Sequence, residues 1–273
     1  MNSVRRFLLG PLLAALLLLP AGCAKSPGGG ATSPVSGPQL IVTMTVAGNI
    51  NPNYYYYVLF NVNRAKGPDG SSMGPVPVVV SADSTGNGYA AGAFTNYVKY
   101  KGGQPGGTDF SYYVVDKTLF NSEALTGRLI QQQAVGNTLR FQLPLASLAT
   151  TNVAVDGINN LQVNFIATNV VPVPGQSLGT PKYFDALYPP QQAGNSYVTL
   201  NIRSGITVLP NIFTNTSLGV NEKAGDVGTQ GNGGVVQVSR PDSGKLSDGV
   251  SQNAINYDDL DITDWTIQLT AGS

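Results

Sequence analysis

The chain has 273 residues, only 11% of which are charged, with 15 basic and 15 acidic side chains and no histidine. An average soluble protein is about 25% charged. Without a basic patch, nucleic acid is excluded as an expected partner. The lack of histidine also excludes serine–histidine hydrolases and the usual histidine-based zinc sites.

Residues 1–22 have the three parts of a secretory signal peptide. Arg5 and Arg6 supply a positive start, and the run FLLGPLLAALLLL at 7–19 is entirely apolar. This run is shorter than the ~20 residues that cross a bilayer as a helix. Small residues follow at 20–22. We therefore expect export and cleavage, not a membrane-spanning anchor.

Cys23 is the only cysteine and follows Pro20-Ala21-Gly22. This segment resembles the lipobox of bacterial lipoproteins, in which small residues precede a cysteine that becomes the lipidated N-terminus. The resemblance implies a membrane anchor through lipid on Cys23. Ala24 follows, where Asp commonly signals inner-membrane retention, so the resemblance also implies an outer-membrane location if the host has an outer membrane.

The remaining chain divides into a tether at 23–38, rich in Gly, Ser and Pro, and a single domain at 39–273. The domain consists of short apolar runs separated by turn residues, the pattern of an all-β fold. We expect strands at 40–46, 54–62, 76–80, 90–100, 110–115, 128–135, 138–143, 161–168, 197–202, 235–238 and 262–269, and one helical turn at 145–148. This number of strands predicts a two-sheet antiparallel β-sandwich, either jelly-roll or immunoglobulin-like.

Aromatic side chains could form a ligand-binding surface. Tyr54 and Tyr56 share one face of their predicted strand, and Tyr55 and Tyr57 share the other; Trp265 lies in the last strand. An exposed row of rings would stack on sugar. The alternative is that the rings fill the sandwich core with their hydroxyls at its rim, because aromatic residues favour packed sheets.

Gly70-Ser71-Ser72-Met73-Gly74 matches the G-x-S-x-G string of serine hydrolases. The serine in that string needs a histidine to accept its proton, and this chain has none. Pro68, Asp69 and Pro75 surround the segment. We interpret it as a turn.

Residues 136–145 read GNTLRFQLPL, and Leu148 follows shortly after. This alternating strand that ends in Pro-Leu before a short turn resembles a segment of DOMON domains and family 9 carbohydrate-binding modules. The resemblance implies a β-sandwich that binds sugar or haem. Haem is not expected, because the chain offers no histidine and no Met–His pair as ligands.

Four aspartates lie close together near the C-terminus, at Asp258, Asp259, Asp261 and Asp264. Oxygen-rich clusters suit Ca²⁺, which takes 6–8 oxygen ligands. In an extended strand Asp259 and Asp261 would point to one face. Calcium is therefore the one cofactor that the sequence suggests, although the spacing and glycine of an EF-hand are missing.

Two functions are consistent with these features. The first is a non-catalytic, lipid-anchored module of the cell envelope that binds a glycan or an envelope protein. The second is a carboxylate-based hydrolase of extracellular polysaccharide, because glycosidases need only two acids across the bond. Candidate acids such as Glu123 and Glu222 stand in no recognisable motif, and this favours the first function.

Overall fold

The computed structural model describes residues 37–66, 72–77, 90–115, 123–125, 129–171, 183–187, 197–203, 210–218, 228–231, 234–237 and 255–271. The predicted signal peptide, Cys23 and most of the predicted tether lie outside these ranges. Within them, the short 3-10 turns are η1 (Pro105–Gly107), η2 (Leu145–Leu148), η3 (Val155–Gly157) and η4 (Tyr257–Asp259). No helix in these ranges is long and apolar enough to cross a membrane.

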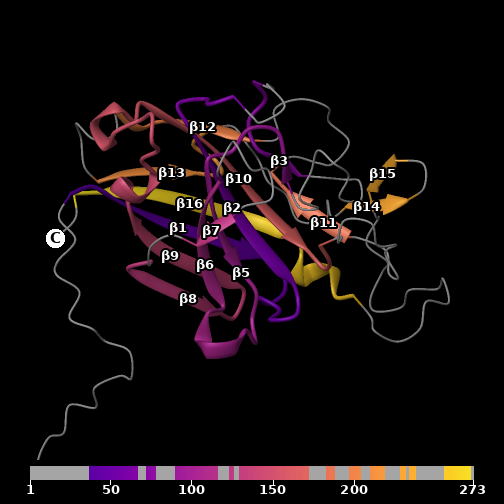
Figure 1. The fold of residues 1–273 in the computed structure, drawn as a ribbon. Helices are drawn as coiled ribbons and strands as arrows, with labels where there is room; N and C mark the ends of the chain where they lie inside the picture. The colour runs from indigo at the N-terminus through magenta and orange to yellow at the C-terminus, as the bar shows by residue number, and fades with distance from the viewer. Residues whose placement is uncertain are drawn as a thin grey trace, which may run out of the picture. The chain divides into compact units, whose positions relative to one another are not determined.

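The smaller of the two main sheets is antiparallel and has five strands. Their order across the sheet is β13 (Asn211–Thr214), β16 (Ile262–Thr270), β1 (Gln39–Val46), β9 (Thr138–Pro144) and β8 (Gln131–Val135). The first and last parts of the domain therefore pair with each other through β1 and β16 (Figure 1).

The larger sheet is also antiparallel. Its order is β15 (Gly234–Gln237), β14 (Gly228–Gly231), β11 (Tyr183–Ala186), β10 (Asn160–Thr168), β2 (Tyr55–Val62), β5 (Asn96–Tyr100), β6 (Phe110–Val115) and β7 (Glu123–Leu125). β12 (Val198–Asn201) pairs with residues 160–163 of β10, and β11 pairs with residues 166–168. A separate pair is formed by β3 (Val76–Pro77) and β4 (Ala90–Ala91).

The facing sides of the two main sheets enclose one hydrophobic core. In β1 the alternating sequence puts Leu40, Val42 and Met44 on the buried side. Phe165 of β10 and Trp265 of β16 meet across the layers, with ring centroids 5.6 Å apart. Each such buried apolar side chain contributes roughly 1.5–3 kcal/mol to folding. The predicted all-β, two-sheet antiparallel sandwich is thereby confirmed.

Most predicted strands agree with the structure at their centres, and η2 confirms the predicted helical turn at 145–148. The single strand predicted at 90–100 is wrong, because the structure has β4 and β5 there with a break between them. Gly92 in the break has a φ of +74°, which is left-handed backbone that interrupts a strand. A side chain at Gly92 would also collide with the carbonyl oxygen of Gly74.

Two tyrosine hydroxyls join the start of β2 to the segment before β16. The hydroxyl of Tyr56 donates to the carbonyl oxygen of Asp259 and accepts from the backbone N–H of Asn51, both at 2.8 Å. The hydroxyl of Tyr54 accepts from the backbone N–H of Asn256 at 3.1 Å. The hydroxyls thus lie at the rim of the core, as the core interpretation of these rings predicts.

These buried hydroxyls make folding stability sensitive to alkaline pH. Burial raises the pKa of both Tyr54 and Tyr56 above the ordinary value, and the nearby charge of Asp259 adds to the rise. Unfolded tyrosine ionises near pH 10. The free energy of unfolding should therefore hold below pH ~10 and fall above it, by up to about 1.4 kcal/mol per pH unit for each tyrosine.

Urea unfolding of the wild type and of Tyr56→Phe between pH 8 and pH 11 measures this dependence. The variant removes one titrating group, so its stability should fall less steeply above pH 10. Equal slopes in the two proteins would contradict the assignment to Tyr56.

Candidate functional site

The predicted aromatic row does not form an exposed surface. Tyr54, Tyr56 and Trp265 belong to the core between the sheets, and the exposed fraction of Trp265 is 1%. Tyr57 is 2% exposed and lies in a second hydrophobic cluster on the opposite face of the larger sheet. Tyr55 is partly exposed beside it. A buried ring cannot stack on a sugar, so the core interpretation is correct for Tyr54, Tyr56, Tyr57 and Trp265.

Cationic side chains lie over the rings on this opposite face. The rings of Tyr55 and Tyr57 are stacked with centroids 6.4 Å apart. The ammonium nitrogen of Lys101 is 4.6 Å from the centroid of Tyr55, and that of Lys99 is 5.0 Å from the centroid of Tyr113. These are cation–π distances. The lysines thus occupy ring faces that a stacked sugar would need.

The four predicted calcium ligands lie in different environments. Asp259 and Asp261 are buried, Asp258 is partly buried and Asp264 is exposed. The expectation that Asp259 and Asp261 share one face of an extended strand is wrong, because residues 257–259 form the 3-10 turn η4. The turn rotates these side chains away from strand alternation.

The carboxylate of Asp259 already accepts three hydrogen bonds. Its oxygens accept from the backbone N–H of Asn49 and from the side-chain amides of Asn51 and Asn256, at 2.8–3.0 Å. Among the described side chains, no group of three or more acidic, histidine or cysteine residues is placed to hold a metal ion. Calcium binding stays a prediction from the sequence.

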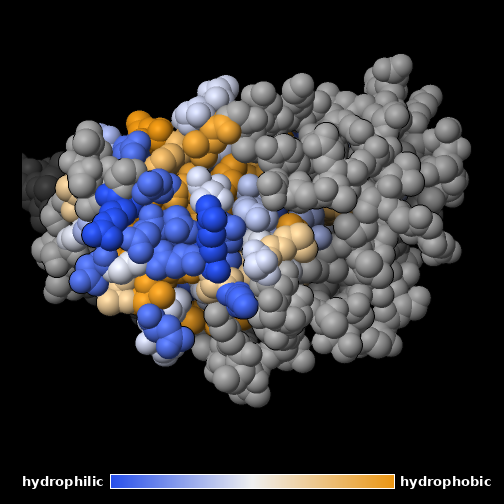
Figure 2. Space-filling view, turned by 90° about the horizontal axis from the view of Figure 1, so that it is seen from above, coloured by the Kyte–Doolittle hydropathy of each residue, from blue (hydrophilic) through white to orange (hydrophobic). Residues whose placement is uncertain are grey.

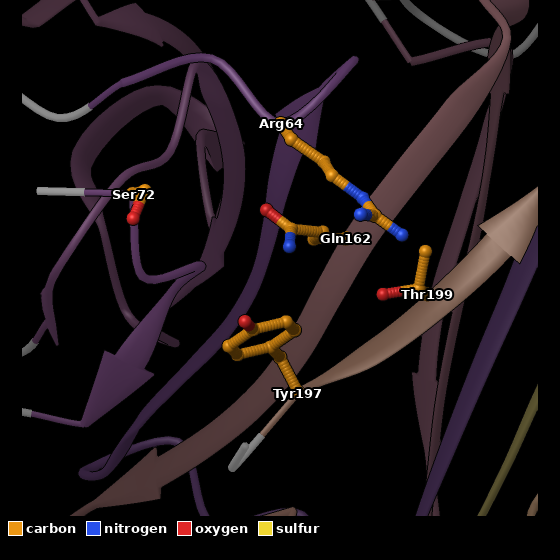
Figure 3. A pocket seen from close by; sticks show the side chains of 5 residues that line it. All are labelled: Arg64, Ser72, Gln162, Tyr197 and Thr199. Atoms are coloured by element: carbon orange, nitrogen blue, oxygen red, sulfur yellow. The ribbon is translucent and has the colours of Figure 1, made fainter. Parts of the chain in front are cut away.

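A pocket of about 430 Å³ opens on the outer face of the larger sheet, at the end where β12 lies. Its described lining residues are Arg64, Ser72, Gln162, Tyr197 and Thr199. Figure 3 shows Gln162 between Ser72 and Thr199, with Arg64 on one side and Tyr197 on the other. The volume falls in the range of roughly 300–1,000 Å³ that small-molecule sites occupy.

The residues that form the floor of this pocket are neighbours because of the strand register. Gln162 of β10 lies opposite Asn61 of β2 on one side and opposite Thr199 of β12 on the other. Directly opposed residues in an antiparallel sheet point to the same face. Three strands that are far apart in the sequence therefore place polar side chains in one row.

Hydrogen bonds determine which end of the Gln162 amide faces the pocket. The side-chain nitrogen of Asn61 donates to the carbonyl oxygen of Ala65 at 3.0 Å and to Oε1 of Gln162 at 2.8 Å. A carbonyl can only accept, so the amide of Asn61 must present its nitrogen to Ala65. Oε1 of Gln162 then faces Asn61, and Nε2 of Gln162 is left on the pocket side.

Arg64 reaches the pocket from an unusual turn after β2. Asn63 and Arg64 both have left-handed backbone, with φ values of 51° and 53°. The side chain of Asn63 holds the turn in place, since it donates to the carbonyl of Gly157 and accepts from the backbone N–H groups of Asn159 and Asn160. Left-handed backbone costs a non-glycine residue about 1 kcal/mol or more. In this left-handed conformation the turn directs Arg64 outward over β10.

The opposite wall is the loop before β3. It is attached to the sheet by the side-chain nitrogen of Asn164, which donates to the carbonyl of Pro75 at 2.9 Å. A Cβ added to Gly74 would lie 2.9 Å from ring carbons of Tyr197, so glycine is needed for the ring to pack there. Ser72, predicted as part of a turn, lines the pocket from this loop.

The described lining of the pocket is rich in hydrogen-bond donors and contains one positive charge. A guanidinium, an amide N–H₂ and three hydroxyls face it, and none of its described lining residues is acidic. Figure 2, which views the molecule from the top of Figure 1, shows a largely hydrophilic described surface with smaller hydrophobic patches. This chemistry suits an oxygen-rich ligand.

The sequence analysis did not identify this pocket. A signal was present in the central strands, where Asn61, Gln162 and Asn164 interrupt otherwise apolar runs. Polar residues are seldom fully buried without a role. Only the register of β2, β10 and β12, however, shows that two of them meet beside Thr199.

The chain matches no protein-family model, no curated protein and no solved structure. The resemblances to the lipobox and to DOMON or family 9 carbohydrate-binding domains therefore stay predictions from the sequence.

Proposed function

We propose that the protein is a lipid-anchored, non-catalytic module of the cell envelope that binds a glycan. The observation that carries this proposal is the donor-rich pocket lined by Arg64, Ser72, Gln162, Tyr197 and Thr199. Sugars present many hydroxyl oxygens, and such ligands are recognised by a few well-placed polar groups in a concave site.

The lining chemistry supports binding over hydrolysis. A glycosidase places two carboxyl groups across the bond that it cleaves, and the pocket's described lining contains none. A serine nucleophile at Ser72 would need a base such as histidine, which the chain lacks. The lack of carboxyl groups in the described lining and the lack of histidine both favour a site that binds its ligand without cleaving it.

The predicted signal peptide and Cys23 support the location. Two or more acyl chains hold a protein stably on a membrane, since each buried CH₂ contributes about 0.8 kcal/mol. The Gly/Ser/Pro-rich residues 24–38 would let a domain on such an anchor reach a nearby polymer. We expect Cys23→Ser to move the protein from the membrane fraction to the soluble fraction, whereas Ser26→Ala should leave it on the membrane.

The binding proposal is tested by thermal shift of the full-length chain in detergent against a panel of soluble oligosaccharides. A ligand that binds only the folded state at a hundredfold excess over its Kd stabilises it by about 2.7 kcal/mol. Thr199→Phe, at an exposed position of the pocket, should abolish the shift. Asn201→Phe, on the same face of β12 but outside the lining, should retain it.

Two outcomes would overturn the proposal. One is the absence of a shift with every oligosaccharide in the panel. The other is release of shortened sugars during the incubation, which would establish the hydrolase instead.

A further inference from the structure

We infer that the pocket selects an acidic sugar, with the sugar carboxylate bound between Arg64 and Gln162. This inference rests on the proposed function and adds the chemical class of the ligand. Within the described part of the chain, the pocket leaves side-chain donors of Arg64 and Gln162 without protein partners.

The amide of Gln162 forms the floor of the pocket. Its side chain is only 3% exposed, and Oε1 is already bonded to Asn61. The contact of Asn61 with Ala65 leaves the donor nitrogen Nε2 facing the pocket. Among the described residues, none accepts a hydrogen bond from this nitrogen. This nitrogen is open to the pocket, so an oxygen of a bound ligand can accept its hydrogen bond.

Arg64 supplies the one positive charge among the described lining residues. The guanidinium of Arg64 also has no hydrogen-bond or ion-pair partner within the described part of the chain, and it projects over the floor that Gln162 forms (Figure 3). Arginine presents parallel N–H donors that match the two oxygens of a carboxylate. A planar oxyanion next to Arg64 and Gln162 would satisfy both groups at once.

The other described lining residues offer hydroxyl groups for the rest of the ligand. Hydroxyls of Ser72, Tyr197 and Thr199 come from a loop, from the residue before β12 and from β12 itself. Figure 3 shows these side chains around Gln162, with Thr199 toward the end of the Arg64 side chain and with Ser72 and Tyr197 on other sides. Groups that both donate and accept suit the hydroxyls of a sugar ring. A small inorganic anion would leave these hydroxyls unused.

The test compares a galacturonate trimer with its methyl ester, which removes the charge and adds a methyl group to each carboxyl, by isothermal titration of the full-length chain in detergent. A charge-assisted contact corresponds to a roughly 10- to 100-fold difference in affinity. Because Arg64 is exposed, we expect the lower end of this range, and we expect added salt to weaken binding of the acid more than binding of the ester.

Variants assign the preference to Arg64. Arg64→Asn removes the charge and accepts left-handed backbone readily, so it should fold and bind both trimers equally. Lys66→Asn removes a charge from an exposed position two residues away, outside the described pocket lining, and should keep the preference for the acid.

The possible failures are distinguishable. Equal binding of acid and ester by the wild type would overturn the inference and leave the proposed glycan-binding function intact. Binding of acetate or sulfate as tightly as the trimer would overturn the sugar part of the inference. Binding of neither trimer, together with no response to any neutral oligosaccharide, would overturn the proposed function itself.

Discussion

Replacing Trp265 with alanine should lower the free energy of unfolding by about 3–5 kcal/mol, the range for removing a large aromatic side chain from a core. Trp265 is among the largest side chains that are fully buried, and its ring stacks on Phe165 of the opposite sheet. The deletion would leave a cavity between the two layers. Urea unfolding followed by circular dichroism measures the loss.

Trp265→Phe should cost much less, about 1 kcal/mol or below. The indole nitrogen of Trp265 is buried without a hydrogen-bond partner in the described part of the chain. An unsatisfied buried donor carries a penalty of about 1–3 kcal/mol, and phenylalanine removes that donor while it keeps most of the contact with Phe165. The packing energy lost with the smaller ring is therefore largely offset by removal of the desolvation penalty of the indole N–H.

Gln268→Ala, on the outward side of the same strand, is the matched control and should change stability by no more than about 0.5 kcal/mol. Sugar binding should survive Trp265→Phe, because the indole lies in the core and not at the pocket. A loss from Trp265→Phe as large as that from Trp265→Ala would show that the indole N–H contributes stability, against this prediction.

Replacing Asp259 with alanine should lower the free energy of unfolding by about 2–4 kcal/mol. Its carboxylate accepts from Asn49, Asn51 and Asn256, and so ties the β1–β2 connection to the segment before β16. Removing it breaks three hydrogen bonds to a buried, charged acceptor, and a hydrogen bond to a charged group contributes about 1.5–3 kcal/mol. Urea unfolding at neutral pH gives the difference.

Asp264→Ala is the control for Asp259, because Asp264 is exposed and accepts a hydrogen bond from the backbone N–H of Trp265 next to it. We expect a change below about 1 kcal/mol. Equal losses in the two variants would contradict the special role of Asp259. Repeating the unfolding with calcium or EDTA also tests the predicted calcium site, since a bound ion would stabilise the wild type and not Asp259→Ala.

The fold was predictable because apolar and polar residues alternate along its core strands. In β1 and β9 every second residue is apolar, so one face is buried wherever the strand pairs. The short strands β11 and β13 were not predicted. Asp185 in β11 and Asn211 in β13 weaken the local pattern, and it is pairing with β10 and β16 that makes these segments strands.

The site was much less predictable than the fold. The sequence predicted ligand-binding sites at Tyr54–Tyr57 and at Asp258–Asp264 because residues of one kind cluster there. In the structure Tyr54, Tyr56 and Tyr57 are buried in hydrophobic clusters, and Asp259 holds a loop in place. A cluster in the sequence indicates a surface only if its side chains face solvent, and burial is decided by what packs on each face of the sheet.

The all-β class follows from the sequence alone, through alternation, turn residues and the scarcity of helix formers, and so does the expectation of export and lipid on Cys23. The pocket, in contrast, depends on the tertiary structure. Gln162 and Thr199 are far from Arg64 and Ser72 in the chain. The four residues meet because β2, β10 and β12 are neighbours in one register and the loop before β3 packs over them. Pairing between distant strands depends on the whole core, so no local pattern encodes that meeting.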